Sequence, residues 1–137
     1  MNTDHFTGLW YDKVNPHPLG LHLNDCATRA LCLAENIQYQ EAHRHITATK
    51  QWWSSRSRSA SYSLKFPLVI RAYGELGWRW VANSSDLGFT AAAIPKDRVI
   101  VVLNQHLTFV DHHVVKDSSD VRGTRTRKLY GWFTKDL

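Results

Sequence analysis

Apolar residues recur at helical spacing in the first half of the chain and at strand spacing in the second half. The pattern in the first half predicts three helices, over residues 25–35, 39–52 and 64–75. Asn24 or Asp25 is expected to cap the first helix, and Asn36 is expected to end it. Pro67 falls in the first turn of the third helix, where proline is tolerated, and Gly77 is expected to stop that helix.

The second half predicts strands over residues 78–81, 98–103, 107–110, 114–117 and 129–133. The segment 98–103 is apolar almost throughout, which is typical of a strand that is buried on both faces. A tight turn at 111–113 joins the next two strands into a hairpin. Helices first and an antiparallel sheet afterwards predict an α+β fold.

Two segments depart from these patterns. Residues 1–22 contain Pro16 and Pro18 and predict an irregular lead-in, with at most a short strand near Leu9–Tyr11. Residues 54–63 are rich in serine and arginine and predict a mobile loop. Neither an internal repeat nor a linker divides the sequence, so residues 1–137 are expected to form a single domain.

Composition indicates a packed protein in a reducing compartment. Hydrophobic residues make up 43% of the 137 residues and aromatic residues 12%, which favours a folded core over disorder. The sequence has no apolar run of membrane-spanning length and its start does not look like a signal peptide, so a cytoplasmic location is expected. Cys26 and Cys32 lie about 9 Å apart along one predicted helix, too far for a disulfide.

A formal charge of +5 raises the alternative of nucleic-acid binding. The basic residues gather in two stretches that look like solvated loops: Arg56 and Arg58, then Arg122, Arg125, Arg127 and Lys128. Exposed tryptophans are a second element of this alternative, because aromatic side chains with arginines can stack on bases. The candidates are Trp52, Trp53, Trp78 and Trp80, all of which are also reasonable core residues.

Cys26 is the first candidate for chemistry because it falls in the first turn of a predicted helix. Unpaired N–H groups and the helix dipole favour negative charge there, and the thiolate is the reactive form of cysteine. A small buried residue with no chemical role is the alternative interpretation of Cys26. Cys32, beside Leu31 and Leu33, fits that inert role better.

His106 and Asp117 are candidates for a base and for the group that orients it. With a turn centred near residue 112, they come out as near-opposite neighbours on the two hairpin strands, about 5 Å apart at Cβ. An ordinary strand-end histidine and a turn aspartate are the alternatives, and Asp120 is a second candidate for the orienting acid.

Four groups of residues resemble a small papain-like cysteine peptidase group found in phages and bacteria. They are Asn24-Asp25-Cys26-x-x-Arg29-Ala30-Leu31, His106-Leu107-Thr108-x-Val110-Asp111, Val114-x-x-Asp117 and Tyr130-Gly131-Trp132. The resemblance implies a papain-like fold, in which a nucleophile helix packs on an antiparallel sheet. It also implies that Cys26 is the nucleophile, His106 the general base and acid, and Asp117 the orienting group.

The chain departs from the papain-like pattern at the oxyanion hole. Such enzymes usually have a glutamine a few residues before the cysteine, where this sequence has Gly20. Asn24, His22 and the backbone N–H of Cys26 are the available donors, and Asn24 together with that N–H is the preferred pair. Asn24 as a helix cap only is the alternative.

These residues predict a thiol hydrolase that cleaves a peptide, isopeptide or related amide bond in a protein or peptide substrate. The same thiol could pass its acyl group to an amine, as an acyl transferase or transglutaminase-like enzyme does. A non-catalytic binding module for nucleic acid or a protein is the third hypothesis. No cofactor is expected, and the pairs His43 and His45, and His112 and His113, make poor metal sites by their spacing.

Overall fold

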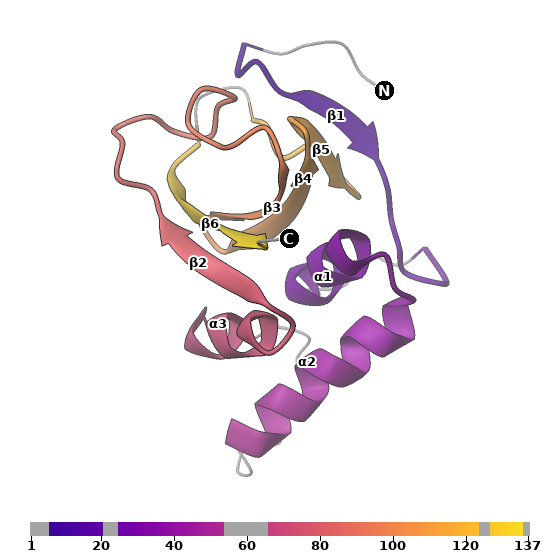
Figure 1. Cartoon of the computed structure of the whole chain (residues 1–137). Coiled ribbons are helices and arrows are strands. Elements are labelled where there is room, and N and C mark those ends of the chain that lie inside the picture. The colour runs from indigo at the N-terminus through magenta and orange to yellow at the C-terminus, as the bar shows by residue number, and fades with distance from the viewer. Residues whose placement is uncertain (1–5, 21–24, 54–65, 124–126, 136–137) are drawn as a thin grey trace.

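The computed structural model describes residues 6–20, 25–53, 66–123 and 127–135, with no side chains described for 50–53 (Figure 1). Its elements, in chain order, are β1 (Trp10–Lys13), α1 (Cys26–Glu35), α2 (Tyr39–Trp53), α3 (Phe66–Gly74), β2 (Trp78–Ala82), β3 (Arg98–Leu103), β4 (His106–Asp111), β5 (Val114–Asp117) and β6 (Leu129–Lys135). This confirms the predicted α+β class, with helices preceding most of the sheet. The predicted loop 54–63 lies outside the described residues.

The six strands form one curved sheet in the order β1-β5-β4-β3-β6-β2. The prediction of a purely antiparallel sheet is wrong, because β1 runs parallel to β5, with Trp10 opposite Val114 and Lys13 opposite Asp117. Alternating apolar residues determine which face of a strand is buried, but not which strand lies beside it. The partner of β1, about 100 residues later in the chain, was therefore not readable from its own pattern.

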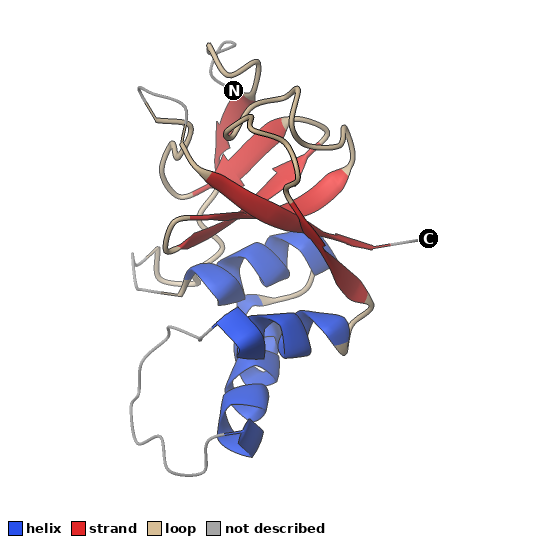
Figure 2. Ribbon diagram, turned by 90° about the vertical axis from the view of Figure 1, so that its left-hand side faces the viewer, coloured by secondary structure: helices blue, strands red, loops and turns tan. Residues whose placement is uncertain are grey.

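All three helices lie on one side of the sheet, and loops cover the other (Figure 2). Helix α1 packs directly on β4 and β3, α2 packs on α1, and α3 packs on α2 and β2. The core on the helical side includes Leu31, Tyr73 and Phe133, whereas the core on the loop side includes Phe89 and Val110. Every residue of β3 after Arg98 is buried, which confirms the predicted two-sided burial.

Helix α1 begins and ends as its sequence predicts. Asp25 occupies the N-cap position, and Asn36 at the C-cap takes the left-handed conformation with φ 55° and ψ 47°. Asparagine tolerates this conformation better than most residues, so the helix stops there. This places Cys26 at the first helical position, facing the end of the sheet where β4 begins and β5 ends.

None of the described helices is long and apolar enough to cross a membrane.

Candidate active site

Cys26 is partly exposed and is the first residue of α1. Its backbone N–H is one of the first four in the helix, which have no acceptor within the helix itself. The next residue, Ala27, is bonded to α3, because the buried hydroxyl of Tyr73 donates a 2.7 Å hydrogen bond to the carbonyl oxygen of Ala27. The thiol therefore sits on a firmly held first turn, with polar backbone groups beside it.

His106 and Asp117 form a close pair at the adjacent end of the sheet. The Nε2 atom of His106 lies 2.7 Å from Oδ2 of Asp117. The His106 side chain keeps 21% of its surface exposed, whereas Asp117 keeps only 8%. The imidazole can therefore reach both solvent and a bound molecule, while the carboxylate behind it is largely shielded.

The pair forms by a diagonal contact, which corrects the expected near-opposite pairing. The hairpin turn contains only His112 and His113, both with positive φ (49° and 67°). Asp111 is then opposite Val114 and Phe109 opposite Lys116, so Asp117 falls beside Thr108 and reaches His106 diagonally. Both contacts lie on one face of the sheet because strand side chains alternate with period two.

The carboxylate of Asp117 accepts hydrogen bonds from three neighbours. Its Oδ2 also receives the hydroxyl of Thr108 at 2.7 Å, and its Oδ1 receives the backbone N–H of Ser118 at 2.7 Å. Burial alone would raise the pKa of Asp117. The hydrogen bond and charge of His106, together with the Thr108 and Ser118 donors, outweigh burial and lower that pKa. Asp117 is therefore an ionised, immobile acceptor for His106.

His106 lies between the carboxylate and the thiol. With Nε2 directed at Asp117, Nδ1 is the ring nitrogen that remains for the side of Cys26. Burial alone would lower the pKa of His106, but hydrogen bonds and charge interactions with Asp117 and Cys26 raise it to about 9. The imidazole is thus positioned to exchange a proton with a group bound at the sulfur.

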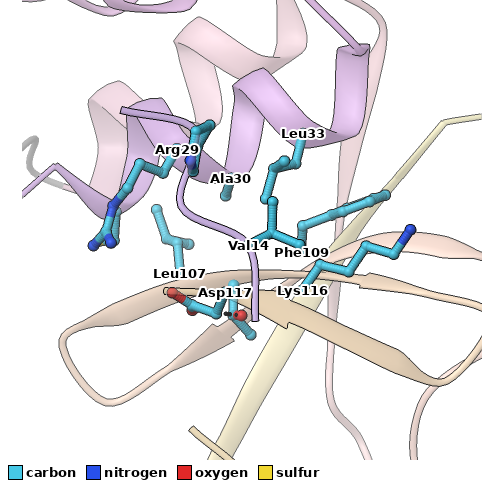
Figure 3. Close-up of a pocket in the computed structure, with 11 residues that line it drawn as sticks. Val14, Arg29, Ala30, Leu33, Leu107, Phe109, Lys116 and Asp117 are labelled. Carbon is cyan, nitrogen blue, oxygen red and sulfur yellow. Dashed lines mark hydrogen bonds between the residues drawn. The ribbon is translucent and has the colours of Figure 1, made fainter. Parts of the chain in front are cut away.

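A narrow crevice adjoins this group between α1 and the strands β4 and β5 (Figure 3). Cys26, Arg29 and Leu33 line it from the helix, and Leu107, Phe109 and Asp117 line it from the sheet. The segment after β1 closes one side through Val14 and Pro16. The N–H of Val14 donates to the carbonyl oxygen of Asp117 at 2.8 Å, so the N-terminal lead-in forms part of the wall of this crevice.

The other residues that were candidates for the triad and the thiol have different surroundings. The carboxylate of Asp120 accepts hydrogen bonds from Nε and Nη2 of the buried Arg122, at 2.9 Å and 2.8 Å. The acid that hydrogen-bonds His106 is therefore Asp117. Cys32 is buried, its Sγ donates to the carbonyl oxygen of Ile37, and burial raises the pKa of its thiol. Asn24 and His22, both candidates for the oxyanion hole, lie outside the described residues.

Two parts of the nucleic-acid alternative are corrected. Arg122 is not in a solvated stretch, because its guanidinium is buried and bonds Asp120 and the carbonyl oxygen of Leu9. Trp78 is buried with its Nε1 donating to Glu35, and Trp80 packs against Phe133. Large aromatic rings at strand positions cover the apolar core here. Several other residues of the nucleic-acid alternative lie outside the described part of the structure: Arg56, Arg58, Arg125 and the side chains of Trp52 and Trp53.

Within the described residues, no group of three or more histidine, cysteine, aspartate or glutamate side chains could hold a metal ion. His45 bonds the carbonyl oxygen of Ala72 at 2.6 Å, and His43 stacks on Tyr39. His112 contacts its neighbour Asp111, while His113 bonds the carbonyl oxygen of Ile94.

Sequence reasoning gave no supporting role to the residues that hold the candidate triad. They are Arg29, Tyr39, Tyr73, Thr108 and Ser118. A signal existed for two of them. Asp25 and Arg29 have opposite charges four residues apart on a helix, and Thr108 shares the face of His106 because it lies two residues later on the same strand.

Comparisons with protein-family models, curated protein sequences and solved structures found no match to this chain.

Proposed function

We propose that this protein is a papain-like cysteine hydrolase that cleaves an amide bond in a protein or peptide substrate. The observation that carries the proposal is the placement of Cys26 at the start of α1 beside His106, whose Nε2 lies 2.7 Å from Oδ2 of Asp117. The arrangement also supports the papain-like assignment, because a helix that starts at the nucleophile packs on adjacent strands that supply the histidine and the acid.

Each residue has one role in the proposed reaction. The Cys26 sulfur attacks the substrate carbonyl carbon, and the resulting oxyanion is stabilised by the Cys26 backbone N–H and, in our assignment, by Asn24. His106 gives its proton to the leaving amine as the C–N bond breaks, which leaves an acyl group on sulfur. His106 then takes a proton from water as water attacks the thioester, and this step releases the acid and regenerates the thiolate.

The buried positions of Trp78 and Arg122 weigh against nucleic acid as the main ligand. Each was a candidate for contact with bases or phosphates, and each is committed to intramolecular contacts instead.

Alkylation of the folded protein with iodoacetamide near pH 6.5, followed by peptide mass spectrometry, tests the nucleophile. We expect Cys26 to react about 10- to 30-fold faster than an ordinary thiol, which is only a few per cent thiolate at neutral pH. The buried Cys32 should react far more slowly. His106→Ala should remove most of the enhancement, whereas His45→Ala, which changes a histidine distant from the site in sequence, should retain it.

Two results would overturn the assignment: a Cys26 that reacts no faster than Cys32, or an enhancement that survives His106→Ala. Once the thiol is confirmed, incubation with a library of peptide amides should give a mass shift on Cys26 from the acyl group, absent in Cys26→Ala. Adding a primary amine then distinguishes hydrolysis from acyl transfer, because a transferase forms the amide product.

A further inference from the structure

Arg29 contacts two segments that flank the candidate triad. It lies about one turn after Cys26 on α1, and its side chain is 12% exposed. Its Nε atom lies 2.8 Å from Oδ1 of Asp25, the residue just before Cys26. Its Nη1 atom donates a hydrogen bond to the hydroxyl of Ser118, the residue just after Asp117. One guanidinium therefore joins the start of the nucleophile helix to the end of β5.

Asp25 gives this junction a fixed anchor. Its side chain is fully buried, and its Oδ2 accepts the hydroxyl of Tyr39 at 2.5 Å. A buried carboxylate is costly unless it is paired with a positive charge and hydrogen-bonded, and Arg29 and Tyr39 supply these two partners. Asp25 makes no side-chain cap bond to α1, so its carboxylate serves this pairing instead of the usual N-cap role.

Ser118 connects Arg29 to Asp117. Its hydroxyl receives Arg29, while its backbone N–H donates to Oδ1 of Asp117 at 2.7 Å. Asp117 in turn holds His106. Three hydrogen bonds, by way of Asp117 and Ser118, thus connect the imidazole to Arg29 on the helix that carries the thiol.

We propose that Arg29 is a positioning residue that holds Cys26 within reach of the His106–Asp117 pair by linking Asp25 to Ser118. The inference rests on the proposed function. Arginine suits the task because its guanidinium spreads one positive charge over a planar fork, so it can form an ion pair with the Asp25 carboxylate and donate a hydrogen bond to the Ser118 hydroxyl together. Lysine carries the same charge on a single atom and cannot preserve both contacts in this geometry.

The chain offers a matched control at the other end of the same helix. Arg98 on β3 donates from Nη2 to the carbonyl oxygen of Ala34 at 2.7 Å, and so ties the last turn of α1 to the sheet. Arg98→Lys and Arg29→Lys are therefore the same chemical change at the two ends of α1. Only the change at Arg29 affects the contacts beside the triad.

The experiment measures the rate of Cys26 alkylation from pH 5 to 10, with folding checked by circular dichroism. We expect Arg29→Lys to lower the rate at pH 6.5 about tenfold, because the thiol loses its aligned imidazolium. Ser118→Ala should reproduce part of this loss, since it removes the arginine contact but keeps the N–H donor to Asp117. Adding Ser118→Ala to Arg29→Lys should cause little further loss, because both changes break one link. Arg98→Lys should keep the wild-type profile.

Retention of the wild-type profile in Ser118→Ala and in any folded Arg29→Lys protein would overturn the role of Arg29. Should Arg29→Lys fail to fold, Ser118→Ala decides alone. A wild-type protein whose Cys26 shows no His106-dependent enhancement would instead overturn the proposed function, so the two failures are distinguishable.

Discussion

At the scale of single residues, the polar groups buried at one end of the sheet hold the candidate triad and its neighbours in place through hydrogen bonds. Asp25, Thr108, Asp117 and Ser118 are all buried, and each hydrogen-bonds another member of the site or a residue that holds one. Apolar residues at these positions would stabilise the fold without desolvating polar atoms. Their concentration beside the Cys26 thiol is what a preorganised reactive centre requires.

The raised pKa of His106 predicts a pH-dependent contribution to stability. A shift from 6.5 to about 9 means that the folded protein binds the proton more tightly than the unfolded chain. The contribution is therefore complete below pH 6.5, where it reaches at most about 3 kcal/mol, and is lost as the pH rises to 9. Urea unfolding of wild type and His106→Gln should show a free-energy difference that shrinks across this interval. A difference that stays constant from pH 6 to 10 would contradict the shift.

The sequence pointed to the three residues of the candidate triad more clearly than to the residues that hold them. Cys26, His106 and Asp117 could be proposed because helix starts and hairpins leave local patterns. The bonds from Arg29 to Ser118 and from Tyr39 to Asp25 join separate segments of the chain, and a serine after a strand looks the same whether it receives Arg29 or faces water. Single-sequence patterns carry no information on such pairs.

At the scale of elements, the β4–β5 hairpin determines where the acid lies. Its two-residue turn puts His112 and His113 in the left-handed region, the arrangement that matches the twist of paired strands. A turn one residue longer would have placed Asp117 in another register relative to His106. The sequence does not reveal the length of this turn, because histidine, unlike Asn-Gly, gives little sign of positive φ.

His112→Val should destabilise the protein by about 1–2 kcal/mol, because a β-branched residue is strained in the left-handed region. His112→Asn is the matched control and should leave the stability nearly unchanged, since asparagine tolerates positive φ. Urea unfolding at fixed pH measures both. Equal stabilities for the two variants would show that the turn has a different conformation in solution.

At the scale of the whole molecule, two cores share one sheet. The helical core and the loop-side core contact opposite faces of β3, through Ile100 and Val102 on one side and Val99 and Val101 on the other. Loss of packing in either core would expose one face of β3, the strand whose other face belongs to the second core. The α+β class followed from the order of patterns along the chain, whereas the parallel pairing of β1 depends on a contact between distant segments.

Unfolding is therefore expected to be a single transition. Circular dichroism and alkylation of the buried Cys32 should give the same midpoint in urea, because Cys32 becomes accessible only when the helical core opens. Tyrosine or tryptophan fluorescence from the loop side should follow the same curve. An early Cys32 reaction, well before the loss of sheet signal, would indicate helices that detach separately.

The place of β6 in the sheet has a consequence for the timing of reactivity during synthesis. β6 is the last strand along the chain, yet it lies between β3 and β2 and contacts both. A ribosome-bound chain that has just completed β5 already contains Cys26, His106 and Asp117, but its strand β2 has no strand joining it to β3. We therefore expect the proposed nucleophile Cys26 to reach its full reactivity only after β6 has joined the sheet.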